Sequence, residues 1–243
     1  MRFLRAILGG FFYLMFGVGG LLFSFALLFP VPQSAARRVL RSLFGFFVWL
    51  GGITRLFRVD VSQEDRKRFA SLSGAVVVSN HQTLIDAVIL ISLLGDSVCV
   101  TKEAVSRNPF MRVVARSVLV VNDGPVAVMR QAVRYLSEGV NVLVFPEGTR
   151  VPQKAREHVF RRGAAHIAIQ AKAPVGLVLI ECDETVLAKG QPWWDVKDRT
   201  VVYRVSARGI VMPADFPLND PACGSRQAAS QLTDIMHRGI FGL

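Results

Sequence analysis

Short apolar runs recur through the second part of the chain, and they constrain its fold more than any other feature. They read AVVVS (75–79), SVCVT (97–101), SVLVV (117–121), NVLVF (141–145), VGLVLI (175–180) and TVVYRVSA (200–207). Such runs, rich in β-branched residues and without a regular polar face, predict strands covered on both faces of a sheet. Helical patterns are found near 86–94, 103–115, 126–138, 161–172 and 225–238. The sequence therefore predicts an α/β fold with a mixed, mostly parallel sheet flanked by helices.

The first 59 residues differ in composition from the rest of the chain. They contain seven arginines, no lysine and no acidic residue, set among Phe, Leu and Gly, whereas a mixture of acidic and basic residues follows. We therefore expect two parts, hydrophobic membrane-anchoring helices over residues 1–59 and an α/β domain over residues 60–243. Arginines beside apolar residues suit an anionic membrane surface.

Two apolar runs predict how this first part meets a membrane. Residues 6–29 carry no charge, and a helix of that length can cross about 30 Å of hydrocarbon. Residues 42–54 form a shorter run between Arg41 and Arg55. The two runs predict either a spanning helix or a hairpin that dips into the bilayer. We expect a bacterial inner membrane, with the α/β domain on its cytoplasmic face. A secretory signal peptide is the alternative, although the first run is long for one.

The net charge of +11 raises the question of nucleic-acid binding. The sequence has no lysine-rich run and no aromatic platform beside a basic stripe, so we expect no nucleic-acid partner. A basic surface also attracts substrates that carry phosphate. The cysteines Cys99, Cys182 and Cys223 have no metal-binding spacing. We therefore expect neither a disulfide framework nor a metal site.

A histidine and an aspartate follow the first predicted strand, in the segment NHQTLID (residues 80–86). Four residues separate His81 from Asp86, and a turn entering a helix would let the carboxylate fold back toward the imidazole. An aspartate bound to one ring nitrogen stabilises the imidazolium and leaves the other nitrogen as a base. The pair is thus a candidate general base for a hydroxyl. The plainer interpretation is a helix cap, because Thr83 and Asp86 match a capping box.

A second polar cluster, FPEGTR (residues 145–150), follows the fourth predicted strand. Pro146 ends that strand, and Gly148 permits a turn whose N–H groups can face a ligand. Arg150 offers a planar fork suited to phosphate, and Glu147 can accept a hydrogen bond. In parallel sheets, ligands gather beyond the carboxyl ends of strands, so we expect the two clusters to meet in one cleft.

Together, NHQTLID and FPEGTR resemble two motifs of the glycerolipid acyltransferases, in particular the branch that acylates lysophosphatidic acid. The resemblance covers about residues 74–185 and implies a glycerol-3-phosphate acyltransferase-like fold. It implies that His81 is the general base, that Asp86 orients it, and that an acceptor hydroxyl attacks the thioester of acyl-CoA or acyl-acyl carrier protein directly. It implies no covalent acyl-enzyme, no metal and no cofactor beyond this co-substrate. The implied partners are membrane lipid, a lysophospholipid acceptor and the acyl donor.

The resemblance also implies which residues bind the substrate. Arg150 would lie near the phosphate of the acceptor. The other residues that would line or assist the same cleft are Asn80, Lys102, Pro146, Glu147, Gly148, Thr149 and Arg162. The apolar N-terminal part would match the membrane-docking helices of the family.

Two positions depart from the pattern of the family. Asn122 follows the third predicted strand where the second motif has an arginine, and Leu177 stands where the fourth motif has a second proline. The first departure removes an expected phosphate contact, which Arg107, Arg116 or Arg162 could replace. We therefore predict 1-acylglycerol-3-phosphate as the acceptor, with another lysophospholipid, an ornithine lipid or a polyene lipid as the alternative. A catalytically silent membrane-binding protein is a distant alternative.

Overall fold

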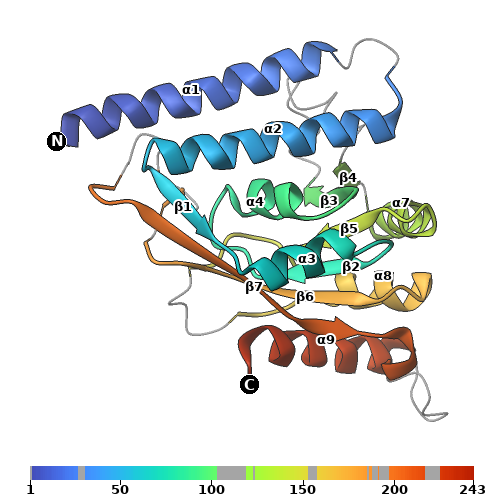
Figure 1. The fold of residues 1–243 in the computed structure, drawn as a ribbon. Helices are drawn as coiled ribbons and strands as arrows, with labels where there is room; N and C mark the ends of the chain where they lie inside the picture. Colours follow the sequence, from blue (N-terminus) through green and yellow to red (C-terminus); the bar gives the residue numbers. More distant parts are fainter. Residues whose placement is uncertain are drawn as a thin grey trace.

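The computed structural model describes residues 2–26, 31–102, 119–122, 124–152, 158–184, 186–187, 191, 197–216 and 225–243. Within these residues seven strands form one sheet, in the order β1-β7-β6-β2-β5-β3-β4 (Figure 1). The strands are β1 (Phe57–Asp60), β2 (Val76–Ser79), β3 (Ser97–Lys102), β4 (Leu119–Asn122), β5 (Asn141–Val144), β6 (Val175–Cys182) and β7 (Val201–Val211). All neighbours are parallel except β6 and β7, which are antiparallel. The predicted mixed, mostly parallel sheet is confirmed.

Each of the six predicted apolar runs forms a strand, but β1 was not predicted. It is four residues long and contains Arg58 and Asp60, so it shows no apolar run. It pairs in parallel with the edge of the sheet, where Phe57 is opposite Val201. The division of the chain into two parts at residue 59 stays a prediction, and its boundary lies inside this strand.

The described helices include four of the five that the sequence predicts. The four are α4 (Asp86–Leu93), α7 (Pro125–Ser137), α8 (Gly163–Ala171) and α9 (Ser225–Phe241). The structure also describes α1 (Arg2–Ala26), α2 (Gln33–Ile53), α3 (Gln63–Ser71) and a short 3-10 helix, η1 (Pro213–Asp215). The predicted helix near 103–115 lies outside the described residues. Helix α3 was missed, although Ser62 caps it by accepting a hydrogen bond from the Asp65 N–H at 3.0 Å.

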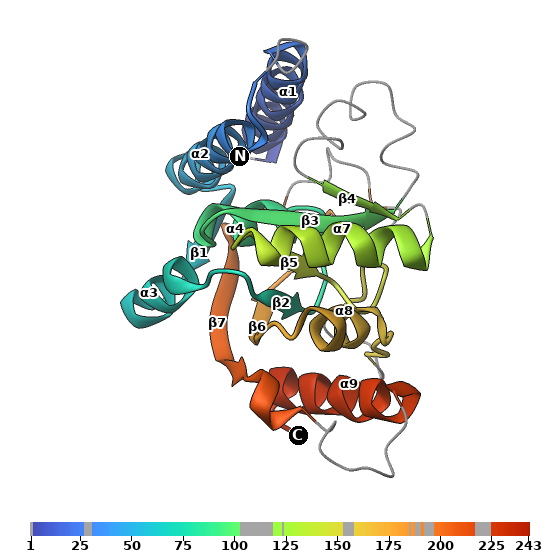
Figure 2. The ribbon, with the colours of Figure 1, turned by 90° about the vertical axis from the view of Figure 1, so that its right-hand side faces the viewer.

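Strand β2 shows how the sheet is covered on both faces. Val76 and Val78 pack with residues of α7, α8 and α9, whereas Val77 packs with residues of α3 and α4 on the opposite face. All three valines are fully buried. Alternate side chains of a strand point to opposite faces, so an unbroken valine run is what a doubly covered strand requires. Helix α9 lies at the opposite end of the molecule from α1 and α2 (Figures 1 and 2).

The two N-terminal helices lie side by side and pack on the α/β body (Figures 1 and 2). Phe12 of α1 is buried. The centre of its ring lies 4.2 Å from that of Phe47 in α2 and 5.7 Å from that of Phe57 in β1. Arg37 of α2 is also buried, and it donates to both carboxylate oxygens of Asp96, at 2.6 and 2.8 Å. A buried arginine needs such a partner. The predicted apolar N-terminal helices are therefore present and attached to the body.

Among the residues that the structure describes, no helix is both long and apolar enough to cross a membrane. Of the two arrangements predicted for residues 6–29, a spanning helix or a hairpin, the first is not found in the described part, which ends at Ala26. Part of the apolar surface of α1 is instead used within the protein, because Phe12 joins the hydrophobic core that includes α2 and β1.

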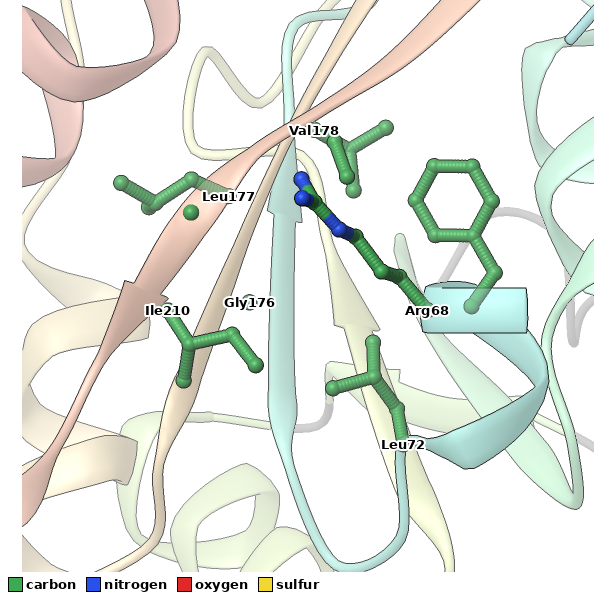
Figure 3. Close-up of a pocket in the computed structure, with 9 residues that line it drawn as sticks. Arg68, Leu72, Gly176, Leu177, Val178 and Ile210 are labelled. Carbon is green, nitrogen blue, oxygen red and sulfur yellow. The ribbon is translucent and has the colours of Figure 1, made fainter. Parts of the chain in front are cut away.

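An apolar cavity of about 300 Å³ lies between α3 and the strands β6 and β7 (Figure 3). The side chain of Arg68 reaches from α3 toward Val178 across it (Figure 3). The register of β6 and β7 shifts between Leu177 and Val178, and Gly209 has a φ of +130°, which other residues rarely adopt. None of the predicted catalytic or substrate-binding residues lines this cavity.

Two adjacent glycines in α2 test how this helix packs. A methyl group on Gly51 would lie 2.4 Å from ring atoms of Phe57, whereas one on Gly52 would meet nothing within 4 Å. We expect Gly51→Ala to lower the free energy of unfolding by about 1–3 kcal/mol through overpacking. Gly52→Ala should raise it by about 0.5–1 kcal/mol, because alanine favours a helix. Urea denaturation in detergent micelles measures both, and equal effects would contradict the packing of α2 on β1.

Candidate active site

The two polar clusters meet at one edge of the sheet, as the sequence predicts. Strands β2 and β5 are parallel neighbours with Val78 opposite Val144, so their carboxyl ends lie together. The backbone N–H of His81 donates to Glu147 Oε2 at 2.8 Å, and the N–H of Val151 donates to the His81 carbonyl at 2.7 Å. His81 is thus held on both sides of its Cα by the segment that follows β5.

The His81–Asp86 pair forms as predicted. His81 Nδ1 lies 2.9 Å from Asp86 Oδ2. The Asp86 side chain is fully buried, whereas that of His81 is 19% exposed and so open to a substrate. An ionised carboxylate can only accept, so Nδ1 carries the proton and Nε2 has a free lone pair. Among the described residues, Nε2 has no hydrogen-bond partner. This arrangement makes Nε2 a base directed at whatever enters the site.

Asp86 is held by its own loop. Its Oδ2 also accepts from the backbone N–H groups of Gln82 and Thr83, at 2.6 and 2.8 Å, and its Oδ1 accepts from the Thr83 hydroxyl at 2.5 Å. The interpretation of Thr83 as a helix cap is wrong, because α4 begins at Asp86 itself and its N-cap position is Ile85. The carboxylate lies in the first turn of α4, where the helix dipole favours a negative charge.

The imidazole of His81 stacks on an aromatic ring that the sequence did not single out as functional. The rings of His81 and Phe145 lie 4.2 Å apart, centroid to centroid, with an interplanar angle of 23°. Phe145 is the residue before Pro146, and a proline restricts its predecessor to extended conformations. The stacking and the bond to Asp86 therefore fix the plane of the imidazole.

Glu147 lies beneath His81 and is almost completely buried. Its side chain is 1% exposed. Besides accepting from the His81 N–H, it binds Nδ1 of His158 through Oε1 at 2.5 Å. Burial raises the pKa of Glu147, and the hydrogen bonds from His158 and His81 partly oppose this rise. Its contacts support the backbone of His81, and its predicted place in the acceptor cleft stays a prediction.

The glycine of FPEGTR makes the predicted turn. Its N–H donates to the Phe145 carbonyl at 3.0 Å, and its φ of +66° is one that favours glycine. A Cβ at Gly148 would also lie 3.4 Å from Nε of Arg161. Pro146 is buried and Thr149 is half-buried in the same turn. Arg161, the neighbour of the predicted Arg162, therefore packs close to this turn.

Arg150 is tied to a neighbouring loop. Its Nη1 donates to the carbonyl of Leu187 at 2.6 Å, and Leu187 has a φ of +50°. A guanidinium has five N–H groups, so one carbonyl leaves donors for a phosphate. The predicted contact between Arg150 and a phosphate stays a prediction.

Asn80 has a structural contact rather than an open position. Its side chain is fully buried, its Nδ2 donates to the Ile180 carbonyl at 2.8 Å, and its Oδ1 accepts from the Ile180 N–H at 2.8 Å. These two bonds join the end of β2 to β6. The structure therefore gives no support to the predicted contact of Asn80 with substrate.

The remaining predicted positions differ in where they lie. Lys102 is the last residue of β3 and is opposite Asn122, the last residue of β4. Arg162 is exposed at the N-cap position of α8. Arg107 and Arg116 lie outside the described residues. Leu177 is buried in β6 and lies close to Gly239 of α9, so this departure from the motif belongs to the core.

The described residues do not form a metal-binding cluster. In the described part of the chain, no three His, Cys, Asp or Glu side chains come together in a group that could hold a metal ion. The described site instead contains two histidine–carboxylate pairs, His81 with Asp86 and His158 with Glu147.

Comparison with known proteins agrees with the resemblance of the motifs. The model of the acyltransferase family matches residues 58–180, a range that is just over half of the chain and includes both polar clusters. The crystal structure of the 1-acyl-sn-glycerophosphate (LPA) acyltransferase PlsC from Thermotoga maritima has a TM-score of 0.66 to this chain at 22% identity. It covers 100% of this chain and 97% of that one, and it shows that the two share a fold.

Similar sequences carry the same enzyme name. The chain is 29% identical over 155 residues to the 1-acyl-sn-glycerol-3-phosphate acyltransferase of Limnanthes douglasii, and the matched region covers 60% of this chain and 52% of that protein. It is 28% identical over 223 residues to the alpha form of 1-acyl-sn-glycerol-3-phosphate acyltransferase from Mus musculus, and the matched region covers 85% of this chain and 75% of that protein. The chain thus spans about half the length of the plant relative.

The hydrogen bonds to Asp86 predict the effect of its removal on stability. Asp86→Ala would leave the buried N–H groups of Gln82 and Thr83 without an acceptor, and each such group costs about 1–3 kcal/mol. We expect the free energy of unfolding to fall by about 2–5 kcal/mol, and by less than half as much in Asp86→Asn, which keeps an acceptor oxygen. Urea denaturation compares the two variants. Equal losses would show that the loop does not depend on that carboxylate.

Proposed function

The chain belongs to the acyltransferase family, and we propose that it transfers a fatty acyl chain from an acyl thioester to the hydroxyl of 1-acylglycerol-3-phosphate, giving phosphatidic acid. One observation carries this proposal, namely the geometry of His81. Its Nδ1 is bound to a buried carboxylate, and the ring remains accessible. The names of the similar enzymes support the class of acceptor.

The proposed reaction needs one base and no covalent acyl-enzyme. Nε2 of His81 takes the proton of the acceptor hydroxyl while the hydroxyl oxygen attacks the thioester carbonyl carbon. Asp86 stabilises the imidazolium that results. The tetrahedral intermediate then loses its C–S bond, and the imidazolium returns the proton to the departing thiolate. The products are an ester and a free thiol, so we propose acyl-CoA or acyl-acyl carrier protein as co-substrate and no other cofactor.

Basic residues around the site favour an acceptor that carries a phosphate. Arg150 belongs to the turn that holds His81, and Arg162 is exposed at the N-cap position of α8. Lys102 ends β3 at the same edge of the sheet. We propose these three as the phosphate-binding groups. Asn122 stands where an arginine was expected, and this difference favours an alternative acceptor for the same reaction. That acceptor would be another lysophospholipid, an ornithine lipid or a polyene lipid.

Removal of the imidazole tests the proposal. We expect His81→Ala to lower kcat by about 10²–10⁴-fold, the usual contribution of a general base. The assay offers palmitoyl-CoA, oleoyl-CoA and acylated carrier protein to the full chain in mixed micelles. Lysophosphatidic acid and a panel of other lyso-acceptors are compared as acceptors, and circular dichroism checks that the variant is folded.

The outcomes separate the candidate functions. Transfer to lysophosphatidic acid that depends on His81 would support the proposal, and transfer to a different acceptor alone would favour the alternative acceptors. Transfer that survives His81→Ala at the wild-type rate would refute the role of His81. Lipid binding without transfer from any donor would favour a catalytically silent membrane-binding protein.

We further propose that α2 and α1 attach the enzyme to a membrane surface. The buried stripe of α2 contains Ala36, Leu40, Phe47 and Gly51, and a second stripe at helical spacing is exposed: Val39, Leu43, Phe46, Trp49 and Ile53. On α1 the exposed large apolar side chains are Ile7, Phe11, Leu14, Met15, Val18, Leu21, Leu22 and Phe25. A helix that is apolar on its outer face, with tryptophan and nearby arginine, suits the boundary between headgroups and acyl chains. We place this surface on the cytoplasmic face of a bacterial inner membrane.

Substitutions on the exposed stripe of α2 test the attachment. The rings of Phe46 and Trp49 lie 5.5 Å apart, and both residues are more than half exposed. Burial of each such side chain is worth about 1.5–3 kcal/mol, so we expect Phe46→Ser with Trp49→Ser to weaken binding to phosphatidylglycerol vesicles at least tenfold in a flotation assay. A matched control replaces Val126 of α7 and Ile210 of β7, which are also more than half exposed, by serine. Similar losses in both double variants would refute a specific docking surface.

A further inference from the structure

We propose that His158 positions the catalytic base, because it holds Glu147 and, through Glu147, the backbone of His81. This inference rests on the proposed function of His81. His158 belongs to neither of the two motifs, and it lies eight residues beyond the end of FPEGTR. It is a positioning residue, because its contacts reach His81 only through Glu147.

A continuous line of hydrogen bonds joins the two histidines. His158 Nδ1 lies 2.5 Å from Glu147 Oε1, and the other oxygen of the same carboxylate accepts from the His81 N–H at 2.8 Å. The Glu147 side chain is 1% exposed and that of His158 is 11% exposed, so water does not replace either contact freely. A buried carboxylate needs a partner for its charge. His158 supplies that partner, since an ionised carboxylate can only accept and Nδ1 must therefore donate.

His158 is itself held from two directions. Its ring lies 4.8 Å from the ring of Phe241 in α9. The backbone close to His158 is held as well, because the N–H of Arg161 donates to the Pro146 carbonyl at 2.9 Å. This bond ties the segment after His158 to the turn that contains Glu147. The imidazole of His158 thus bridges α9 and the turn that supports the base.

Loss of the His158 donor should disturb the position of His81 without removing its chemistry. The bond from Val151 to the His81 carbonyl, the bond to Asp86 and the stacking on Phe145 would remain. Only the support of the His81 N–H would weaken. A displacement of the reacting group by less than 1 Å is enough to lower a rate by roughly tenfold. The loss should therefore appear in kcat and not in KM for either substrate.

The charges around His158 give the expected direction of a pH effect. Glu147, just after β5, faces His158, and His81 lies on the other side of that carboxylate. Arg161 follows three residues after His158 in the chain. His237 of α9 lies 5.0 Å from the Phe241 ring that His158 contacts. Burial raises the pKa of Glu147 and the bond from His158 lowers it. Without that bond the pKa rises further, so on acidification Glu147 loses its charge at a higher pH. The acid limb of the kcat profile should therefore move to higher pH.

The experiment compares two substitutions at His158. His158→Phe keeps a ring for Phe241 but has no donor, whereas His158→Asn places an amide N–H near the position of Nδ1. We expect His158→Phe to lower kcat about tenfold, with KM for both substrates within twofold and with the acid limb at higher pH. His158→Asn should restore kcat to within about threefold of the wild type. The control is His237→Phe, which should leave kcat and the pH profile unchanged.

Two outcomes would overturn the inference. One is a wild-type kcat and pH profile in His158→Phe, and the other is an equal loss in His158→Phe and His158→Asn, which would mean that the ring matters only for packing.

A second measurement does not depend on activity. In protein with ¹⁵N-labelled histidine, the Nδ1–H proton of His158 should resonate far downfield and move upfield in Glu147→Gln, but not in Asp86→Asn. If the wild-type protein transfers no acyl chain, the proposed function fails. This spectrum still decides whether the link between His158 and Glu147 exists, and an unchanged resonance in Glu147→Gln would refute it.

Discussion

The parallel pairing of β2 with β5 is the constraint on which the site depends. The two strands end at the same edge, so the segments that follow them meet although more than sixty residues separate His81 from Glu147. The valines of β2 are fully buried on both faces. A slip of one residue would exchange the two faces of the strand, so the register, and with it the alignment of the two segments, is strongly determined.

Much of the fold follows from local patterns, and the missing parts are those with weak patterns. Unbroken apolar runs identify strands because each must be covered on two faces, and five of the seven described strands have such a run. The run of β7 is interrupted by Arg204, and its buried and more exposed residues alternate at its start. Strand β1 has none, since Arg58 and Asp60 break it, and it is held by pairing with β7 at the edge of the sheet. The order of the strands is also absent from the pattern, because it depends on which buried runs become neighbours.

The same distinction separates the predicted and the missed parts of the site. His81 and Asp86 lie five positions apart, so a turn alone brings them together. Asn80 is joined to Ile180 across 100 positions, and no local pattern could show that its amide is used to bind two strands. Phe145 was predicted as the last residue of a strand, and β5 ends one residue earlier, at Val144. Its role beneath the imidazole depends on the neighbouring strand.

The two buried carboxylates beneath His81 show why local and distant contacts differ in consequence. Within the described part of the chain, the hydrogen bonds to Asp86 come from residues 81–83, so its arrangement moves with the catalytic loop as one unit. Glu147 is bound by two separate segments, one through the His81 backbone and one through His158. The first carboxylate can set which ring nitrogen carries the proton, and the second can set where the ring lies. Because His158 packs on Phe241, the position of the base is tied to α9 at the far end of the chain.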